Sequence, residues 1–400
     1  GYRIVRPDGS MRWIESHGEV VQDSAGEVTG IRGVCMDVSP ERVVTRLRDA
    51  ASSLAALFSR ETDIDDALAR MLAIVGEAIE SEVAALWAAP IPGGEARATW
   101  AREAEAAAAL LDQLRPPDQV TIAELFARRS ATLHPLRSPI QGTAQSLPLS
   151  HSFAIAIQGP SGEALVAQWF TAPPMVAEQI VLQSLDTIAT EASEFVRRLE
   201  AEHRLQARER QHAAVARLGR RALTGATEDE LLAEATSLIA KTLGVEFTEV
   251  LKLLPGESEV LLVAGTGWRD GLVGHSTEPT GAQSQAGFAI LANRAVITHD
   301  LSTEDRFTPP TLLRDHGVMA GISCVIQGDD GAWGVLGAHT ATSRSFTDDD
   351  AAFLESVANV LASAVERARR EHMQALLLEV SDLLATSLDP QETMDQLASI

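Results

Sequence analysis

The 400-residue chain carries 33 Lys and Arg against 56 Asp and Glu, giving a net charge of −23, and 45% of its residues are hydrophobic. This hydrophobic content is sufficient for the folded cores of about two to four domains, and the acidic charge excludes nucleic-acid binding as the main activity because it repels phosphate groups. No run approaches the roughly 20 apolar residues of a membrane span, no signal peptide is recognisable, and two cysteines are too few for a disulfide framework. We therefore expect a cytoplasmic protein.

Three runs with period-two alternation open the chain, over residues 2–6, 11–21 and 28–37. Such alternation predicts strands, and the Pro, Asp and Gly residues between the runs predict tight turns, so we expect three antiparallel strands. Ser39 is followed by Pro40, which favours the first position of a helix. We expect Ser39 to cap the helix that follows.

Beyond this segment the sequence repeats itself. Leu68, Leu232 and Met394 occupy equivalent positions in three helix pairs, at spacings of 164 and 162 residues. The segment Ile157-Gln158-Gly159 recurs 169 residues later as Ile326-Gln327-Gly328. Repeats this long indicate tandem copies of a whole domain, because solenoid repeats span only about 20–50 residues.

The sequence of each copy predicts, in chain order, a helix pair, strands, a loop-rich middle, a hairpin and a long amphipathic helix. In the second copy the hairpin covers residues 321–339 with a turn at 328–331, and Thr347 with Asp350 predicts a capping box at the start of the last helix. The last helix of each copy runs into the next copy without Pro or Gly. We therefore expect the domains to be joined by helices. Since the chain begins in a strand-like run and ends in a helix-like run, we also expect it to be part of a longer one.

The first forty residues resemble the second half of a PAS domain. The resemblance is carried by residues 2–10, 12–14, 30–33 and 37–42. It implies that Asp37 and Ser39, in the segment Asp37-Val38-Ser39, tie the last strand to an outgoing signalling helix. The ligand-holding first half of such a domain is absent from this sequence, so the PAS ligand is not identified.

The repeated unit resembles a GAF domain, most strongly in its second copy. The matching segments include Gly265-Thr266-Gly267-Trp268, residues 284–288, 300–307, 316–318, 333–337 and 346–350. The first copy departs from the pattern in its middle, around residues 104–117, and residues 377–392 resemble the opening helices of a third GAF domain. The resemblance implies a ligand pocket in the second copy, which we place at Trp268, Phe288, His299, Phe307 and Val318.

Together these features predict an α+β fold with tandem GAF domains, each an antiparallel sheet flanked by helices, after the last strands of a PAS domain and with connecting signalling helices. The expected parts are a partial PAS domain at residues 1–42, a first GAF domain at 43–200, a second GAF domain at 201–370, and a signalling helix with the start of a third GAF domain at 371–400.

The cofactor or ligand is not identified by the residues. Asn293-Arg294 with Phe346 and Asp350 resembles part of a cyclic-nucleotide motif, but Ala351 stands where the motif has Glu, and Asp350 is better explained as a helix-start residue. Cys324 lies within an apolar run without an adjacent His, which favours a buried core residue over a bilin attachment site. His299 and His316 flank the loop-rich middle, where a haem ligand would lie, but a lone His is usually structural. We predict no metal site and no catalytic residue here, because ligand pairs, nucleophile elbows and phosphate loops are missing.

Residues 197–221 hold eight arginines against three glutamates. We interpret them as a solvated helix in which Glu194 with Arg198, and Glu200 with Arg204, form pairs one turn apart. Apolar residues follow this helix at 4-3 spacing: Ile188, Ala192, Phe195, Leu199, Val215, Leu218 and Ala222. This seam predicts a parallel homodimer.

The order of domains resembles bacterial sensor histidine kinases. It implies a sensory region that binds a small ligand or a partner and relays the signal through helices to an output beyond residue 400. The phosphoacceptor box and ATP lid of a kinase do not occur in these 400 residues, so enzyme activity is left open. A serine phosphatase of the sporulation type, a diguanylate cyclase and a ligand-free dimerisation scaffold are the alternatives.

Overall fold

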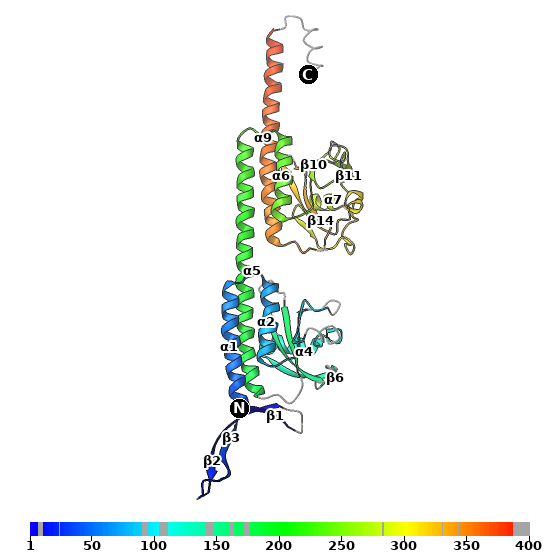
Figure 1. Ribbon diagram of the computed structural model, residues 1–400. Helices are drawn as coiled ribbons and strands as arrows, with labels where there is room; N and C mark the ends of the chain where they lie inside the picture. Colours follow the sequence, from blue (N-terminus) through cyan, green and yellow to red (C-terminus); the bar gives the residue numbers. More distant parts are fainter. Residues whose placement is uncertain are drawn as a thin grey trace. The chain divides into compact units, whose positions relative to one another are not determined.

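The computed structural model describes residues 1–6, 11–23, 25–89, 95–103, 111–140, 148–159, 164–171, 177–281, 284–329, 331–342 and 344–386. The chain divides into two compact units, residues 1–204 and 205–400. Figure 1 shows helices and antiparallel sheets in both units. The predicted α+β fold is therefore confirmed.

The predicted N-terminal strands are present as β1 (Tyr2–Val5), β2 (Met11–Gln22) and β3 (Val28–Asp37), which pair antiparallel in the order β1-β2-β3. The expectation that Ser39 caps the next helix is wrong. Helix α1 (Ser39–Arg60) already includes Ser39, and its N-cap is Val38, whose side chain makes no capping hydrogen bond. The Ser39 hydroxyl accepts a hydrogen bond from the backbone N–H of Trp13 at 2.8 Å instead, which ties the helix start to β2.

The rest of the first unit contains a helix pair and a five-stranded sheet. After α1 follow α2 (Ile64–Ala78), β4 (Val83–Ala89), β5 (Ala98–Ala101), α4 (Gln119–Arg128), β6 (Thr132–Ile140), β7 (Leu149–Gln158), β8 (Ala164–Thr171) and α5 (Glu178–Leu223). The strand order is β5-β4-β8-β7-β6, and every pair is antiparallel.

The second unit begins within α5 and repeats this plan. Its elements are α6 (Glu228–Leu243), β9 (Phe247–Leu253), β10 (Glu259–Thr266), β11 (Thr277–Pro279), α7 (Gln285–Ala292), β12 (Val296–Thr298), α8 (Thr311–Asp315), β13 (Ala320–Gly328), β14 (Gly331–Thr340) and α9 (Asp348–Thr386). The strand order is β11-β10-β9-β14-β13-β12, so five strands repeat the order of the first sheet and β11 adds an edge.

Two helices of the second unit, α9 and α6, begin at capping boxes. Thr347 and Asp350 form the expected capping box, in which the backbone N–H of each residue donates to the side chain of the other at 3.1 and 3.2 Å. A second box at α6, between Thr227 and Glu230, was not predicted. The connection between copies is helical as expected, because α5 runs from Glu178 to Leu223 without interruption.

The apolar seam predicted to form a dimer is occupied within the chain. Ile188, Ala192, Phe195 and Leu199 are buried in the core of the first unit, where the Phe195 ring stacks on Phe58 with centroids 4.7 Å apart. Leu218 and Ala222 are buried in the core of the second unit. These residues therefore do not form a free dimer seam.

One of the two predicted pairs of opposite charge on α5 is present. Arg204 lies 3.4 Å from Glu200 as expected, but Arg198 pairs with Glu202 at 3.8 Å instead of Glu194. The expected third helix pair cannot be followed, because residues 387–400 lie outside the described residues. In the part of the chain that is described, no helix is both long and apolar enough to cross a membrane.

Candidate functional site

The sheet of the second unit has two chemically different faces because side chains alternate along each strand. Val250, Ile322, Cys324 and Leu336 pack against α6 and α9 in one core cluster. Their neighbours Leu251, Leu262 and Val335 belong to a separate cluster with α7, α8 and the adjoining loops. We call the second side the loop-facing side.

Four of the five residues predicted for the pocket belong to this second cluster. Trp268 and Phe288 are half-buried members, and Phe307 and Val318 are buried ones. The rings of Phe288 and Phe307 lie 5.8 Å apart. His299 is exposed and does not belong to the cluster. Four of the predicted residues therefore lie in one hydrophobic cluster, and the histidine does not.

Trp268 is fixed in place by contacts on several sides. Its indole N–H donates to the backbone oxygen of Thr248 at 2.8 Å, and its ring lies 5.0 Å from both Phe247 and His316. The His316 ring nitrogens already have partners, namely the Leu312 carbonyl at 2.8 Å and the Arg269 N–H at 3.2 Å. His316 therefore fits a structural role better than haem ligation.

A buried, hydrogen-bonded pair of polar side chains lies under the loop-facing side. The Glu249 carboxyl on β9 and the His339 ring on β14 are 3.0 Å apart, and their side chains expose only 5% and 0% of their surface. Two glycines make room for the ring, because a Cβ at Gly321 or Gly337 would come within 2.2 or 2.6 Å of its nitrogens. Glu249 Oε2 and His339 Nδ1 have no hydrogen-bond partner among the described residues.

Glu278 on β11 is a second buried carboxyl, with only 6% of its surface exposed. Burial raises the pKa of this group to about 8, and the negative charge of Glu249 adds to the shift. Its Oε1 atom has no hydrogen-bond partner within the described parts of the chain. An unpaired buried polar atom costs roughly 1–3 kcal/mol, so this position favours an additional hydrogen-bonding group.

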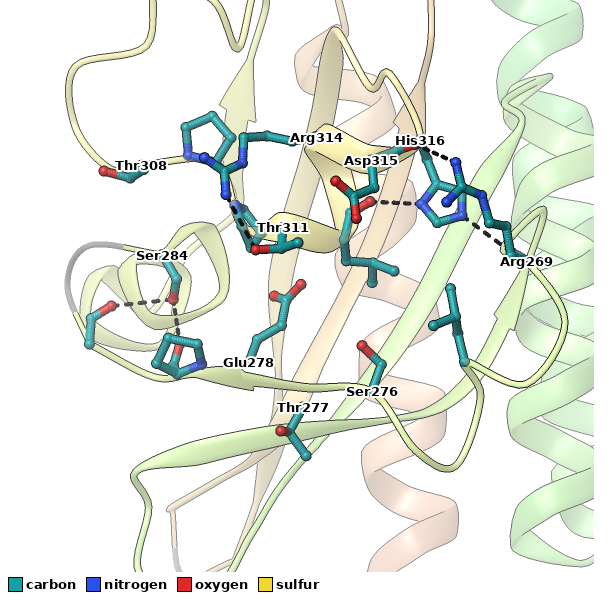
Figure 2. A pocket seen from close by; sticks show the side chains of 16 residues that line it. Arg269, Ser276, Thr277, Glu278, Ser284, Thr308, Thr311, Arg314, Asp315 and His316 are labelled. Atoms are coloured by element: carbon teal, nitrogen blue, oxygen red, sulfur yellow. Dashed lines mark hydrogen bonds between the residues drawn. The ribbon is translucent and has the colours of Figure 1, made fainter.

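Glu278 faces a cavity of about 650 Å³, shown in Figure 2. The cavity is bounded by the β10–β11 connection, the start of α7, and α8 with the loop before it. Its lining combines hydroxyl, charged and apolar side chains: Ser276, Thr277, Ser284, Thr308, Thr311, Glu278, Asp315, Arg269, Arg314, His316, Leu272, Leu312 and three prolines. Leu272 and Leu312 also belong to the hydrophobic cluster, so the two regions are continuous.

None of the five predicted pocket residues lines this cavity directly. Trp268 lies beside it, because it precedes Arg269 and its ring lies 5.0 Å from that of His316. Sequence reasoning missed Glu249, Glu278 and His339. The available signal was an ionisable residue inside a short, mostly apolar run, such as Glu249 in Phe247-Thr248-Glu249-Val250-Leu251.

The predicted signalling exit is built from side-chain contacts. Asp37 Oδ1 accepts the backbone N–H of Ser39 at 3.0 Å. Hydrogen bonds from the Ser39 hydroxyl and backbone, together with Arg12 and Arg6, hold the pKa of Asp37 below its usual range. Arg12 and Arg6 lie 3.5 and 3.9 Å from the same carboxylate. The contacts join β3, α1 and β2 at one point.

The remaining candidate residues have structural partners. Asn293 ends α7 in the left-handed conformation, and Asp350 belongs to the capping box described above. Cys324 is buried, and burial raises the pKa of its thiol, as expected for a core residue. No group of three or more His, Cys, Asp or Glu side chains in the described ranges is placed to hold a metal ion.

The GAF domain family matches residues 227–365, which include the whole site, and the PAS fold matches residues 1–35. These matches support a sensory signalling role for the chain. No curated protein matches it.

Solved structures similar to the chain include three proteins. The GAF domain of a phosphoenolpyruvate-protein phosphotransferase from Acinetobacter is 16% identical with a TM-score of 0.36, covering 40% of this chain and 96% of that one. A GAF domain of such a phosphotransferase from Coxiella burnetii is 14% identical with a TM-score of 0.39, covering 42% and 98%. Free methionine-R-sulfoxide reductase from Neisseria meningitidis is 16% identical with a TM-score of 0.36, covering 40% and 91%.

Proposed function

We propose that this chain is the sensory region of a bacterial signal-transduction protein and that its second unit binds a small molecule in the cavity of Figure 2. The observation that supports this most is the buried Glu278 carboxyl, which faces the cavity with an unpartnered oxygen. Cavities of about 300–1,000 Å³ with a few placed polar groups are typical of small-ligand sites. The cavity lies within the region that matches the GAF domain family.

Helix α9 is the proposed route from the cavity to the output. Glu355 on α9 accepts the backbone N–H of Ala295, in the connection between α7 and β12, at 3.1 Å. Glu366 on α9 accepts the N–H of Asp329, in the β13–β14 turn, also at 3.1 Å. A ligand that binds more tightly when α7 is in one of two positions would therefore shift the equilibrium between two positions of α9.

We propose a histidine kinase as the output, on the basis of the resemblance of the domain order to sensor kinases. The alternatives are a serine phosphatase of the sporulation type and a diguanylate cyclase. The test is phosphate transfer from radiolabelled ATP to the full-length protein, with acid-labile label as the expected result. Acid-stable label, or conversion of GTP to a cyclic dinucleotide, would contradict the kinase proposal.

We further propose a cytoplasmic homodimer formed through the connecting helices. Since the predicted seam on α5 is buried within the chain, the supporting residues are Met373, Leu377 and Leu378 on α9, which are 52%, 59% and 72% exposed. Analytical ultracentrifugation across micromolar concentrations is expected to show a dimer that Leu377→Glu weakens. A strictly monomeric wild-type chain would contradict the dimer.

The competing proposal from another class is a scaffold whose GAF domains bind no ligand. Thermal unfolding of the 400-residue chain with a panel of nucleotides, haem, amino acids and organic acids separates the two. We expect at least one compound to stabilise the wild type, because a ligand that binds only the folded state raises its stability.

Two tryptophan variants locate the binding site in that experiment. Ser276→Trp places a large side chain in the cavity and is expected to abolish the stabilisation by ligand. Ser345→Trp introduces the same side chain at an exposed position outside the cavity lining and is expected to retain it. Equal stabilisation of both variants would place the ligand elsewhere, and stabilisation by no compound would favour the scaffold.

A further inference from the structure

The cavity in the second unit carries opposite charges at two depths. Glu278 is buried at the inner wall, whereas Arg269 and Arg314 are exposed at the rim. The guanidinium groups contact uncharged oxygens, with Arg269 donating to the Asp315 carbonyl at 2.9 Å and Arg314 to the Thr311 hydroxyl at 3.3 Å. Neither arginine forms an ion pair with a described residue. Asp315 adds one negative charge to the rim, which leaves the rim cationic.

We infer that the cavity binds a free α-amino acid or a closely similar zwitterion, with its ammonium group at Glu278 and its carboxylate at Arg314 and Arg269. This inference rests on the proposed function and names the chemical class of the ligand. Figure 2 shows the Glu278 side chain pointing from β11 into the space below α8, with both arginines contributed by other segments.

An ammonium group matches the inner wall because it supplies what the buried carboxyls lack. Glu278 Oε1 and Glu249 Oε2 have no partner among the described residues, and the negative charge of Glu249 disfavours the ionised form of Glu278. An ammonium group donates three hydrogen bonds and carries the opposite charge. A second carboxylate placed at this depth would add to the repulsion, so the ligand's carboxylate belongs at the rim, where guanidinium groups can bind it bidentately.

The hydroxyl and apolar parts of the lining then receive the rest of the ligand. Thr308, Thr311 and Ser276 offer hydroxyl groups, while Leu272, Leu312 and the prolines offer apolar surface. A cavity of about 650 Å³ leaves room for an amino-acid side chain beyond the two charged groups. The charged residues of the cavity therefore determine the chemical class of the ligand, and the hydroxyl and apolar residues select its side chain.

Proton release is a signature of this binding mode. Since burial raises the pKa of Glu278 to about 8, its carboxyl is protonated at neutral pH and must lose the proton to pair with an ammonium group. Affinity is therefore expected to rise about tenfold per pH unit from pH 6 towards 8 and to level off above it. The other titratable or charged groups around Glu278 come from β9, β14, the loop after β10, and α8 with its end: Glu249, His339, Arg269, Arg314, Asp315 and His316.

The test is isothermal titration calorimetry of the 400-residue chain with the proteinogenic L-amino acids. For each binder, the decarboxylated amine and the deaminated acid serve as matched controls; for L-leucine these are 3-methylbutylamine and 4-methylpentanoate. We expect at least one amino acid to bind and both matched compounds to bind at least about tenfold more weakly, since each lacks one charged contact. Titrations in buffers of different ionisation enthalpy are expected to show release of about one proton at pH 7.

Two substitutions assign the contacts by a crossed pattern. Glu278→Gln keeps the shape of the side chain and is expected to weaken the amino acid and the amine, remove the proton release, and leave the deaminated acid unaffected. Arg314→Gln is expected to weaken the amino acid and the acid but not the amine. Arg294→Gln, an exposed arginine outside the cavity lining, is expected to change none of them.

The outcomes separate this inference from the proposed function. If no amino acid binds at millimolar concentration but another compound binds and is lost in Ser276→Trp, the ligand class is wrong while the proposed function stands. If an amino acid binds without proton release and regardless of Glu278, the placement of the ammonium group is overturned. If no compound of any class binds, both fail.

Discussion

The two units differ in the buried polar side chains of one corresponding strand pair, β4 and β8 in the first sheet and β9 and β14 in the second. In the first unit Ala85 on β4 pairs with Gln168 on β8, and the Gln168 side chain accepts from Trp87 at 3.2 Å and donates to Ser152 at 2.8 Å. In the second unit Glu249 on β9 pairs with Gly337 on β14 at the corresponding position, the third residue of the strand. The glycine leaves the space that His339 and Glu249 occupy.

The difference concerns whether the buried polar groups are satisfied. Trp87, Gln168 and Ser152 are nearly inaccessible to solvent, and their side chains complete each other's hydrogen bonds. Glu249, Glu278, Gln285 and His339 are equally buried but keep unpartnered atoms within the described chain. A satisfied network contributes to stability, whereas an unsatisfied one costs stability and is retained where it has another use. The comparison teaches that one scaffold supports a closed core in one copy and a candidate binding site in the other.

The largest expected effect that tests this contrast is the pH dependence of the second unit. Since the pKa of Glu278 is about 8 in the fold and about 4.5 in the unfolded chain, the folded state holds the proton more tightly. Its stability contribution is full below about pH 4.5 and is lost progressively as the pH rises, amounting to about 4 kcal/mol by pH 8. Hydrogen exchange of amides in β13 and β14, followed from pH 5 to 8, measures this loss.

Two variants control for other titrating groups in that experiment. Glu278→Gln is expected to remove most of the loss of stability between pH 5 and 8. Glu259→Gln, at an exposed position on the neighbouring strand β10, is expected to leave it in place. Identical pH profiles for wild type and Glu278→Gln would show that the carboxyl is not the cause.

A smaller effect is expected from opening the closed network of the first unit. Gln168→Leu leaves the Trp87 N–H and the Ser152 hydroxyl without their partner, so we expect it to destabilise that unit by about 2 kcal/mol. Gln183→Leu makes the same exchange at an exposed position of α5 and is expected to change stability by less than about 0.5 kcal/mol. Chemical denaturation, with hydrogen exchange of β7 and β8 to localise the change, is the measurement. Equal effects of the two variants would contradict the closed-network interpretation.

The elements of the fold could be predicted from the sequence because each rests on local patterns. Alternation located the first strands to within a residue or two, and the capping box at Thr347 was visible from two residues three positions apart. The apolar seam on α5 was also visible, but its partner was not. Whether Phe195 packs against a second chain or against Phe58 depends on the tertiary fold, which spacing along one helix does not contain.

The residues that line the cavity could not be predicted from the sequence, for the same reason. Trp268, Phe288, Phe307 and Val318 followed from resemblance, and large apolar residues in these segments converge on one cluster. Glu278 lies in the three-residue strand β11, too short for a periodic pattern to indicate which way a side chain points. His299 is the opposite case. It was predicted to line the pocket, but its side chain is exposed.

The smallest expected effects concern the helices that pack against each sheet, for which the two units should behave alike. Asp63 caps α2 by accepting the N–H of Asp66 at 2.9 Å, and Thr227 caps the corresponding helix α6 by accepting the N–H of Glu230 at 3.3 Å. Replacing either cap with Ala leaves one helix N–H unpaired, so each variant is expected to lose about 1 kcal/mol in its own unit. The two losses are measured from hydrogen exchange of α2 and α6. A loss confined to one unit would mean that the units differ on the helix side as well, and the contrast would no longer be specific to the loop-facing sides of the two sheets.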